Sequence, residues 1–132
     1  MDNSVEELYR VVNDSRGNVV IAREVVWAGT SSLRRRGLLG RDSLNAGEGI
    51  YLAPCEWLHT FGMRFPIDVA FLSADGQVLS VHHGLKPNRL SKIVFRADGA
   101  LELPAGTLRA SMTEVGDVVR FVNIARHELR PV

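Results

Sequence analysis

The stretch Ile67-Asp68-Val69-Ala70-Phe71-Leu72 decides the class of fold. Successive residues of a strand point to opposite faces of a sheet, so this stretch places Ile67, Val69 and Phe71 on one face. A tight-turn signal, Ala74-Asp75-Gly76, follows it, and residues 78–81 supply a partner strand. The sequence therefore predicts an antiparallel hairpin at the centre of the domain.

The same alternation of strand and turn signals recurs along the chain. Further strands are predicted over residues 5–12, 19–27, 50–53, 92–96, 100–103 and 118–122. A short helix is predicted over residues 30–37, and a helical turn over 108–114. Short, closely spaced strands of this kind predict a mainly β fold, an antiparallel β-sandwich or closed barrel with one or two short helices. An interlocked small β-barrel is the alternative architecture.

Length and composition indicate one globular domain over residues 1–132, with a polar tail at 123–132. The chain has 132 residues, of which 45% are hydrophobic, and a single cysteine. No apolar run approaches the roughly 18–20 residues that a membrane span needs. The acidic, polar start and the lone cysteine predict a soluble, cytoplasmic protein without an internal disulfide.

Arginine dominates the positive charge of the chain. Only Lys86 and Lys92 are lysines among 16 basic residues, while the formal net charge is +1. The planar guanidinium group suits carboxylate and phosphate groups. A near-neutral total argues against a dedicated nucleic-acid binder, so no nucleic-acid partner is expected.

Asp68 is the most informative polar residue, because every neighbour in its strand is apolar. We therefore expect its carboxylate to be buried, and a buried carboxylate must be paired or hydrogen-bonded. Arg36, Arg41 and Arg64 are the candidate partners. A structural ion pair is favoured over a catalytic carboxylate, because structural pairs also perturb pKa values.

Several separated motifs resemble one known family. They occupy residues 35–41, 48–52, 59–71, 75–76, 101–106 and 116–117. The region from about residue 31 to 122 is similar to domain-of-unknown-function family 192. Many relatives carry tryptophan where this chain has Gly62, and Lys-Asn where it has Arg64-Phe65. The resemblance implies a compact, mostly β domain and no established reaction; some relatives begin with an export signal, which is not expected here.

Nucleophilic catalysis is a minor hypothesis. Cys55, His59 and Asp68 are the three residue types of a thiolate–imidazole–carboxylate set, but their order and spacing match no nucleophile signature. Cys55 is better explained as a small buried side chain after Pro54. A small hydrolase-like enzyme would instead use His59 as base and Asp68 to orient it.

A metal site is not expected either. The side chains that could in principle supply ligands are Cys55, His59, Asp68, His82, His83 and Glu102. They lack a recognised zinc spacing, and the adjacent His82 and His83 point to opposite faces of a strand. We therefore predict no metal and no cofactor.

The aromatic side chains Trp27, Trp57, Phe61 and Phe65 are expected as core or rim anchors. Exposure of these rings beside the arginines would instead favour a base-stacking platform.

These observations favour a non-catalytic accessory or binding module, a monomer or weak dimer. Its cleft would accept a small anionic group or a protein partner, and its expected lining is Arg36, Arg41, His59, Arg64 and Asp68. The hydrolase-like enzyme and a purely structural or interaction protein are the alternatives.

Overall fold

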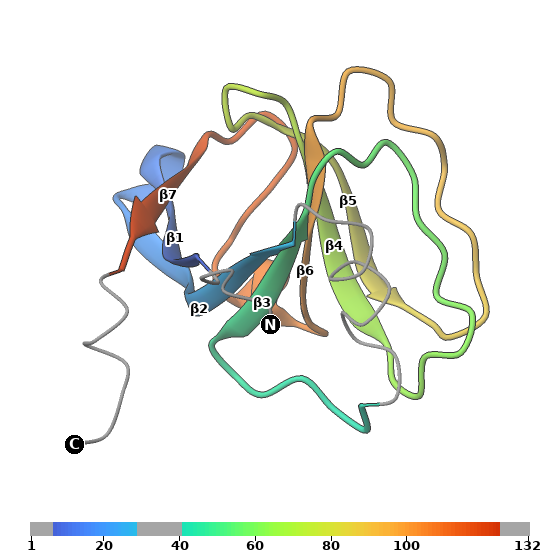
Figure 1. Cartoon of the computed structure of the whole chain (residues 1–132). Coiled ribbons are helices and arrows are strands. Elements are labelled where there is room, and N and C mark those ends of the chain that lie inside the picture. Colours follow the sequence, from blue (N-terminus) through green and yellow to red (C-terminus); the bar gives the residue numbers. More distant parts are fainter. Residues whose placement is uncertain (1–6, 29–40, 125–132) are drawn as a thin grey trace, which may run out of the picture.

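Seven strands form one mixed sheet in the computed structural model, which describes residues 7–28 and 41–124 (Figure 1). The strands are β1 (Leu8–Asn13), β2 (Val19–Ala28), β3 (Glu48–Leu52), β4 (Ile67–Leu72), β5 (Val78–Leu85), β6 (Gly99–Pro104) and β7 (Val119–Asn123). A 3-10 turn, η1 (Asp14–Arg16), joins β1 to β2, and a one-turn helix, α2 (Thr107–Ala110), follows β6. Across the sheet the order is β5-β4-β6-β3-β2-β1-β7. The mainly β prediction is confirmed.

One pair of neighbouring strands departs from the predicted antiparallel pattern. β2 and β3 run parallel, whereas the other neighbouring pairs in the sheet are antiparallel. Parallel neighbours need a crossover connection, because the chain must return to the end of the sheet where it began. The chain between the end of β2 at Ala28 and the start of β3 at Glu48 is long enough for that return.

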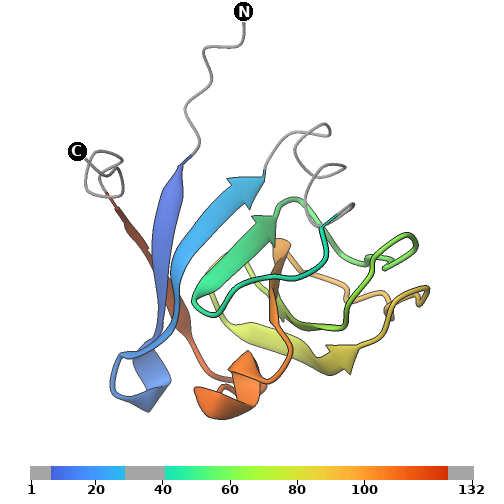
Figure 2. The ribbon, with the colours of Figure 1, turned by 90° about the horizontal axis from the view of Figure 1, so that it is seen from below.

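The sheet curls into a half-barrel (Figure 2). The turn that precedes β5 meets the start of β7, so the two edge strands approach each other at one end. Gln77 forms an isolated antiparallel bridge with Val118. The amide of Val119 donates to the carbonyl of Gly76 at 2.9 Å. A Cβ atom on Gly76 would lie 2.3 Å from the carbonyl oxygen of Val119, and its φ is +84°, so only glycine fits this contact.

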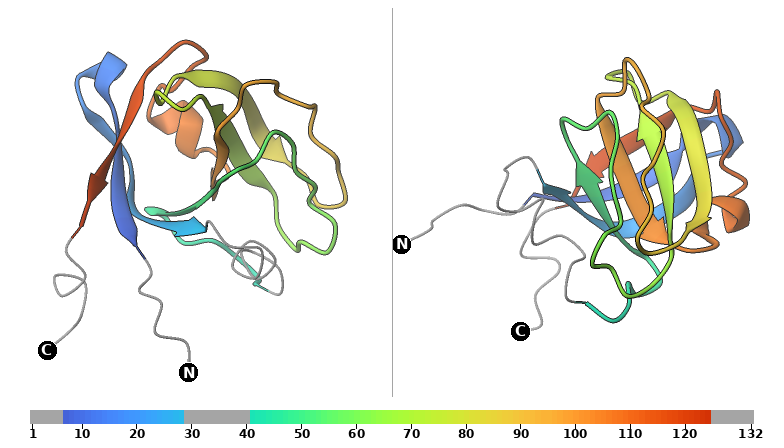
Figure 3. Two further views of the ribbon diagram at one scale, coloured as in Figure 1. Left: turned by 45° about the horizontal axis from the view of Figure 1, so that its top comes forward. Right: turned by 90° about the vertical axis from the view of Figure 1, so that its right-hand side faces the viewer.

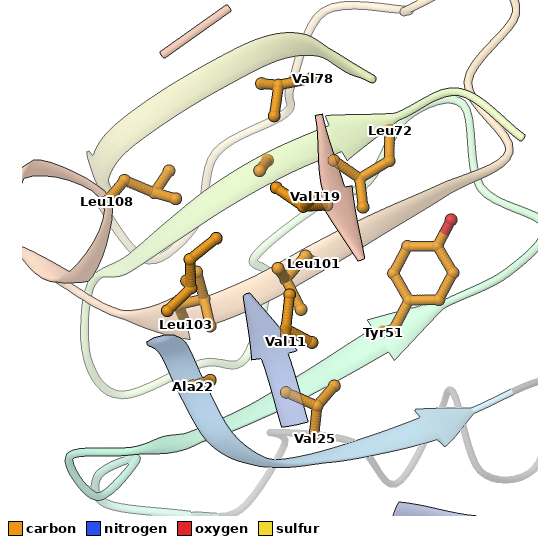
Figure 4. Packing of buried hydrophobic residues seen from close by; sticks show 12 residues of the cluster. Val11, Ala22, Val25, Tyr51, Leu72, Val78, Leu101, Leu103, Leu108 and Val119 are labelled. Atoms are coloured by element: carbon orange, nitrogen blue, oxygen red, sulfur yellow. The ribbon is translucent and has the colours of Figure 1, made fainter. Parts of the chain in front are cut away.

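Two apolar clusters cover the two faces of the sheet. The inner cluster fills the concave face, where side chains from every strand and from α2 converge (Figure 4). The outer cluster lies on the convex face, between the sheet and the loops beyond it. Its buried members are Ala28, Leu44, Ile50, Leu52, Leu58, Met63, Ile67, Val69, Phe71, Ala97 and Ala100.

β4 contributes to both clusters and is buried along its whole length. Ala70 and Leu72 belong to the inner cluster, and Ile67, Val69 and Phe71 to the outer one. The alternation predicted from the sequence is therefore confirmed, although both faces of the strand are covered.

Asp68 shares the inner face of β4 and is completely buried, as predicted. Its Oδ1 atom accepts a hydrogen bond from the amide of Gly84 at 2.9 Å. Its Oδ2 atom accepts from the amides of Gly106 at 3.0 Å and Leu108 at 2.9 Å. Three backbone donors thus satisfy the carboxylate and connect β4 to the end of β5 and to the start of α2.

The prediction that an arginine pairs with Asp68 is wrong for Arg41 and Arg64, the two candidate arginines that the structure describes. Arg41 pairs with Glu48 and Arg64 pairs with Asp42. Backbone amides replace the guanidinium because β4 lies between two packed strands, where nearby N–H groups already point at the carboxylate. Arg36 lies outside the described residues.

Most predicted strands appear within a few residues of their expected bounds, and β4 matches them. Residues 92–96 form no strand, contrary to the prediction, because they pair with a loop outside the sheet. The predicted helix at residues 30–37 lies outside the described residues. In residues 7–28 and 41–124, no helix is long and apolar enough to cross a bilayer.

We expect Asp68→Asn to lower the free energy of unfolding by about 2–4 kcal/mol, because an amide nitrogen would then face a buried N–H donor. Chemical denaturation followed by circular dichroism measures the change. Asp75→Asn is the matched control, since Asp75 is exposed in the β4–β5 turn and should change stability by less than about 0.5 kcal/mol. Equal, small effects of both substitutions would contradict the role given to Asp68.

Candidate functional site

Two long loops pair with each other on the convex side of the sheet. One loop, residues 53–66, links β3 to β4, and the other, residues 86–98, links β5 to β6. Both lie at the right of the molecule in Figure 1, and the right panel of Figure 3 looks onto this side. We call the paired segments, residues 55–62 and 88–96, the loop ribbon.

Backbone hydrogen bonds hold the two halves of the loop ribbon antiparallel. The amide of Thr60 donates to the carbonyl of Arg89 at 2.9 Å. The amide of Ser91 donates to the carbonyl of Leu58 at 2.9 Å, and the Leu58 amide donates to the Ser91 hydroxyl at 2.9 Å. The loop ribbon is therefore a two-stranded structure outside the main sheet.

Thr60 joins the two halves of the loop ribbon on the side that faces the sheet. Its side chain is fully buried. Its hydroxyl donates to the carbonyl of Lys86 at 2.6 Å and accepts from the amide of Arg89 at 2.9 Å. One hydroxyl thus fixes the entry of the second loop against the first.

The underside of the loop ribbon packs on the sheet. Leu58 is buried in the outer cluster, and Val94 and Cys55 pack against that cluster partly buried. This apolar contact fixes which side of the loop ribbon faces outward.

The outward side of the loop ribbon is strongly apolar. Leu58 and Thr60 are buried while Trp57, His59 and Phe61 are exposed, so the first segment alternates as a strand does. His59 lies opposite Leu90. Of the nine large hydrophobic side chains exposed in the described residues, five lie on the loop ribbon, between 48% and 77% exposed: Trp57, Phe61, Leu90, Ile93 and Phe95.

Cations accompany these apolar side chains. The two loops hold five basic residues and two acidic ones, and both lysines of the chain are among the five. Four of the cations are exposed and form no ion pair with any described residue: Lys86, Arg89, Lys92 and Arg96. The outward side of the loop ribbon therefore combines exposed apolar area with positive charge that no carboxylate of residues 7–28 and 41–124 neutralises.

The aromatic residues divide between the core and this surface. Trp27 and Phe65 are partly buried against the inner and outer clusters, as expected for anchors. Trp57 and Phe61 are exposed on the loop ribbon, which also carries the exposed Arg89, and exposed rings beside arginines would favour base stacking. The aromatic prediction thus holds for two of these rings, and the other two belong to a surface.

Among the described residues predicted to line the cleft, His59 is the one that lies on the loop ribbon. It is exposed, and its ring stacks on Phe61 with the ring centroids 5.1 Å apart. Its Nδ1 atom accepts a hydrogen bond from the Phe61 amide at 3.2 Å, which leaves Nε2 at the surface to carry the proton. His59 can therefore donate a hydrogen bond to a partner.

The structure does not bring His59 and Asp68 together. Asp68 is buried on the concave face of the sheet, while His59 is exposed beyond the convex face. Their hydrogen bonds are with other groups, the Phe61 amide for His59 and three backbone amides for Asp68. The predicted base-and-orienter pair does not form in this arrangement.

The predicted arginines lie elsewhere. Arg41 contacts Glu48 at 3.0 Å and Arg64 contacts Asp42 at 2.9 Å. The Arg64 pair is well exposed, and such pairs contribute little stability. Arg36 is outside the described residues, so its expected place in the cleft stays a prediction.

Cys55 and the histidines form no metal-binding cluster in residues 7–28 and 41–124. The Cys55 thiol donates to the carbonyl of Trp57 at 3.1 Å, so it lies within the loop ribbon. His82 contacts the edge of Phe71, and burial, with smaller contributions from Lys92 and His83, lowers the pKa of His82.

Glu102 is a buried titratable residue. From the sequence it was considered only as a possible metal ligand. It lies on β6 opposite Ile50 of β3 and Val69 of β4, in a row of outer-cluster residues. No described residue donates a hydrogen bond to its carboxyl group or forms an ion pair with it. Burial raises the pKa of Glu102 from 4.5 to about 7.

The sequence places Glu102 between Leu101 and Leu103 in a predicted strand, and this was the only local indication of its position. That alternation normally marks a solvent-facing position. Here the loops cover the convex face, so the same pattern accompanies a buried carboxyl group.

We expect Glu102→Gln to remove a pH dependence of stability. The pKa of Glu102 is higher in the folded state than in the unfolded state. Ionisation of Glu102 therefore costs no stability below pH 4.5, and it lowers the free energy of unfolding as the pH rises from 4.5 to about 7. Relative to the native chain, the variant should be equally stable at acid pH and more stable by about 3 kcal/mol above neutrality. Denaturant titrations across pH measure both.

Glu24→Gln, at an exposed position of β2, is the control and should show no such trend. A stability difference between Glu102→Gln and the native chain that does not vary with pH would refute the assignment.

Comparison with known proteins agrees with the fold. A family model, DUF192, described as "Uncharacterized ACR", matches residues 11–121. No curated protein is significantly similar in sequence.

Two solved structures have a similar fold. One is a protein from Sinorhizobium meliloti described as a "putative transcription regulator", with a TM-score of 0.73 and 22% identity over 92% of this chain and 97% of that chain. The other is a protein of unknown function from Novosphingobium aromaticivorans, with a TM-score of 0.75 and 19% identity over 89% of this chain and 94% of that one. At these identities the likeness shows the fold alone.

Proposed function

The chain belongs to the family DUF192, domain-of-unknown-function family 192, and on that premise we propose that it is a non-catalytic binding module. Its binding surface is the outward side of the loop ribbon. The partner it accepts is both apolar and anionic.

The observation that carries this proposal is the clustering of exposed apolar and cationic side chains on one built surface. An isolated exposed hydrophobic residue needs no explanation, whereas a contiguous patch rimmed by polar groups marks an interaction site. Phe95, which is 77% exposed, and Ile93 contribute little to packing and leave apolar area in water. Burying that area against a partner recovers the hydrophobic free energy.

Positive charge adds selectivity for an anionic partner. Lys92 and Arg89 flank the exposed apolar side chains and have no carboxylate partner among the described residues. A partner carrying negative charge gains attraction without first breaking an internal ion pair. His59, exposed beside Phe61, offers a further donor.

The proposal moves the expected anionic site from a cleft to a surface. Of the predicted lining, His59 belongs to the loop ribbon, while the Asp68 carboxylate is satisfied internally. Arg41 already has a partner in Glu48. The general expectation of a binding module for an anionic group is kept, with different residues carrying it.

The dye 8-anilinonaphthalene-1-sulfonate tests the proposal, because it is small, apolar and anionic. We expect the folded protein to enhance its fluorescence. The double substitution Ile93→Ser with Phe95→Ser should abolish this, and Arg89→Gln with Lys92→Gln should weaken it. Both variants should keep the native free energy of unfolding within about 0.5 kcal/mol per substitution, because the side chains are exposed.

Val115→Ser is the control, since Val115 is exposed to a similar degree in the turn before β7. If the dye does not bind, or if Val115→Ser weakens its binding as much as the loop-ribbon variants do, the proposed surface is wrong.

A further inference from the structure

We propose that the partner of the loop ribbon is the surface of a lipid bilayer that contains anionic phospholipids. Trp57, Ile93 and Phe95 would enter the interfacial region while the neighbouring cations contact lipid headgroups. This inference rests on the proposed function and names the chemistry of its partner.

The apolar side chains have the composition of an interfacial anchor. Surfaces that lie on membranes carry tryptophan, phenylalanine and leucine together with lysine and arginine. The exposed aromatic residues Trp57, Phe61 and Phe95 lie on the loop ribbon beside the aliphatic Leu90 and Ile93. Tryptophan and other amphipathic rings favour the headgroup level of a bilayer.

The charges match an anionic surface better than a neutral one. A lysine or arginine near such a surface contributes about 1 kcal/mol of attraction. Lys86 and Lys92 lie on the second loop, and their long side chains can keep the ammonium group at headgroup level while the stem contacts apolar groups. The Asp98 carboxylate, by contrast, is engaged by the Tyr51 hydroxyl at 2.9 Å.

The backbone of the loop ribbon is prepared for a less polar environment. Backbone N–H and C=O groups that enter an apolar region must be hydrogen-bonded within the protein. The amides of Thr60, Ser91 and Val94 donate across the loop ribbon, the last to the Glu56 carbonyl at 2.7 Å. An ordinary loop would carry a larger desolvation penalty at the same position.

Other partners fit these features less well. A second copy of the chain would bring the same cations of the loop ribbon against each other, and like charges repel. A nucleic acid stacks bases on aromatic rings, yet Leu90 and Ile93 offer no ring, and His59 already stacks on Phe61. A bilayer surface uses aliphatic, aromatic and cationic side chains together.

Co-sedimentation with vesicles tests the inference. We expect the protein to bind vesicles of phosphatidylcholine mixed with phosphatidylglycerol, and to bind pure phosphatidylcholine far more weakly. Arg89→Gln and Lys92→Gln should each weaken binding about five-fold. Ile93→Ser with Phe95→Ser should weaken it by about ten-fold or more.

Two controls keep the same kinds of change away from the loop ribbon. Val115→Ser removes an exposed apolar side chain in the turn before β7, and Arg10→Gln removes an exposed cation on β1. Both should bind vesicles as the native protein does. Added salt should weaken the binding, because it screens exposed charges.

Tryptophan fluorescence gives a second readout. Trp57 is exposed, whereas Trp27 packs among Tyr9, Tyr51 and Phe121. Binding should shift the emission to shorter wavelength as Trp57 leaves water, and Trp57→Phe should remove that shift.

Equal binding to both vesicle types, or equal loss in the control variants, would overturn the inference. Dye binding without vesicle binding would overturn the lipid assignment and leave the proposed function standing. Binding to a single-stranded oligonucleotide without binding to vesicles, lost in the same loop-ribbon variants, would assign the surface to nucleic acid instead.

Discussion

The fold depends on a carboxylate placed inside a strand that is covered on both faces. Asp68 is fully buried in β4, and its carboxyl oxygens are satisfied there because three backbone amides donate hydrogen bonds to them. These hydrogen bonds tie β4 to the end of β5 and to α2. Because these elements are distant in sequence, the hydrogen bonds also fix the positions of β5 and α2 relative to β4.

The convex face of the same strand explains the loop ribbon. Ile67, Val69 and Phe71 need cover, and the two loops supply it, with Leu58 from the first loop and Ala97 from the second. Thr60 locks the loops to each other from the buried side. Packing thus constrains the inward residues, while the outward ones are free to serve another purpose. Their apolar and cationic character is not required by the fold.

Local sequence patterns predicted the positions of the strands well, but they did not predict how the loops pack over the sheet. β4 matches its prediction because its alternation and the following turn are both encoded in adjacent residues. Asp68 was correctly expected to be buried, yet its partners could not be read from the sequence, since backbone amides carry no side-chain signature. Residues 92–96 were predicted as a strand. They do form backbone hydrogen bonds with another segment, but that segment is a loop and not a strand of the sheet. The exposure of Trp57 and Phe61 depends on which side of that pairing faces the sheet, which only the tertiary structure determines.

The central claim is that the loop ribbon is the surface that meets a partner. Hydrogen–deuterium exchange of the native chain, with and without anionic vesicles, tests it without any substitution. The account predicts added protection in residues 55–62 and 88–96, with β1, β2 and β7 unchanged. Protection spread over those strands, or none in the loop ribbon while the protein is bound, would contradict it.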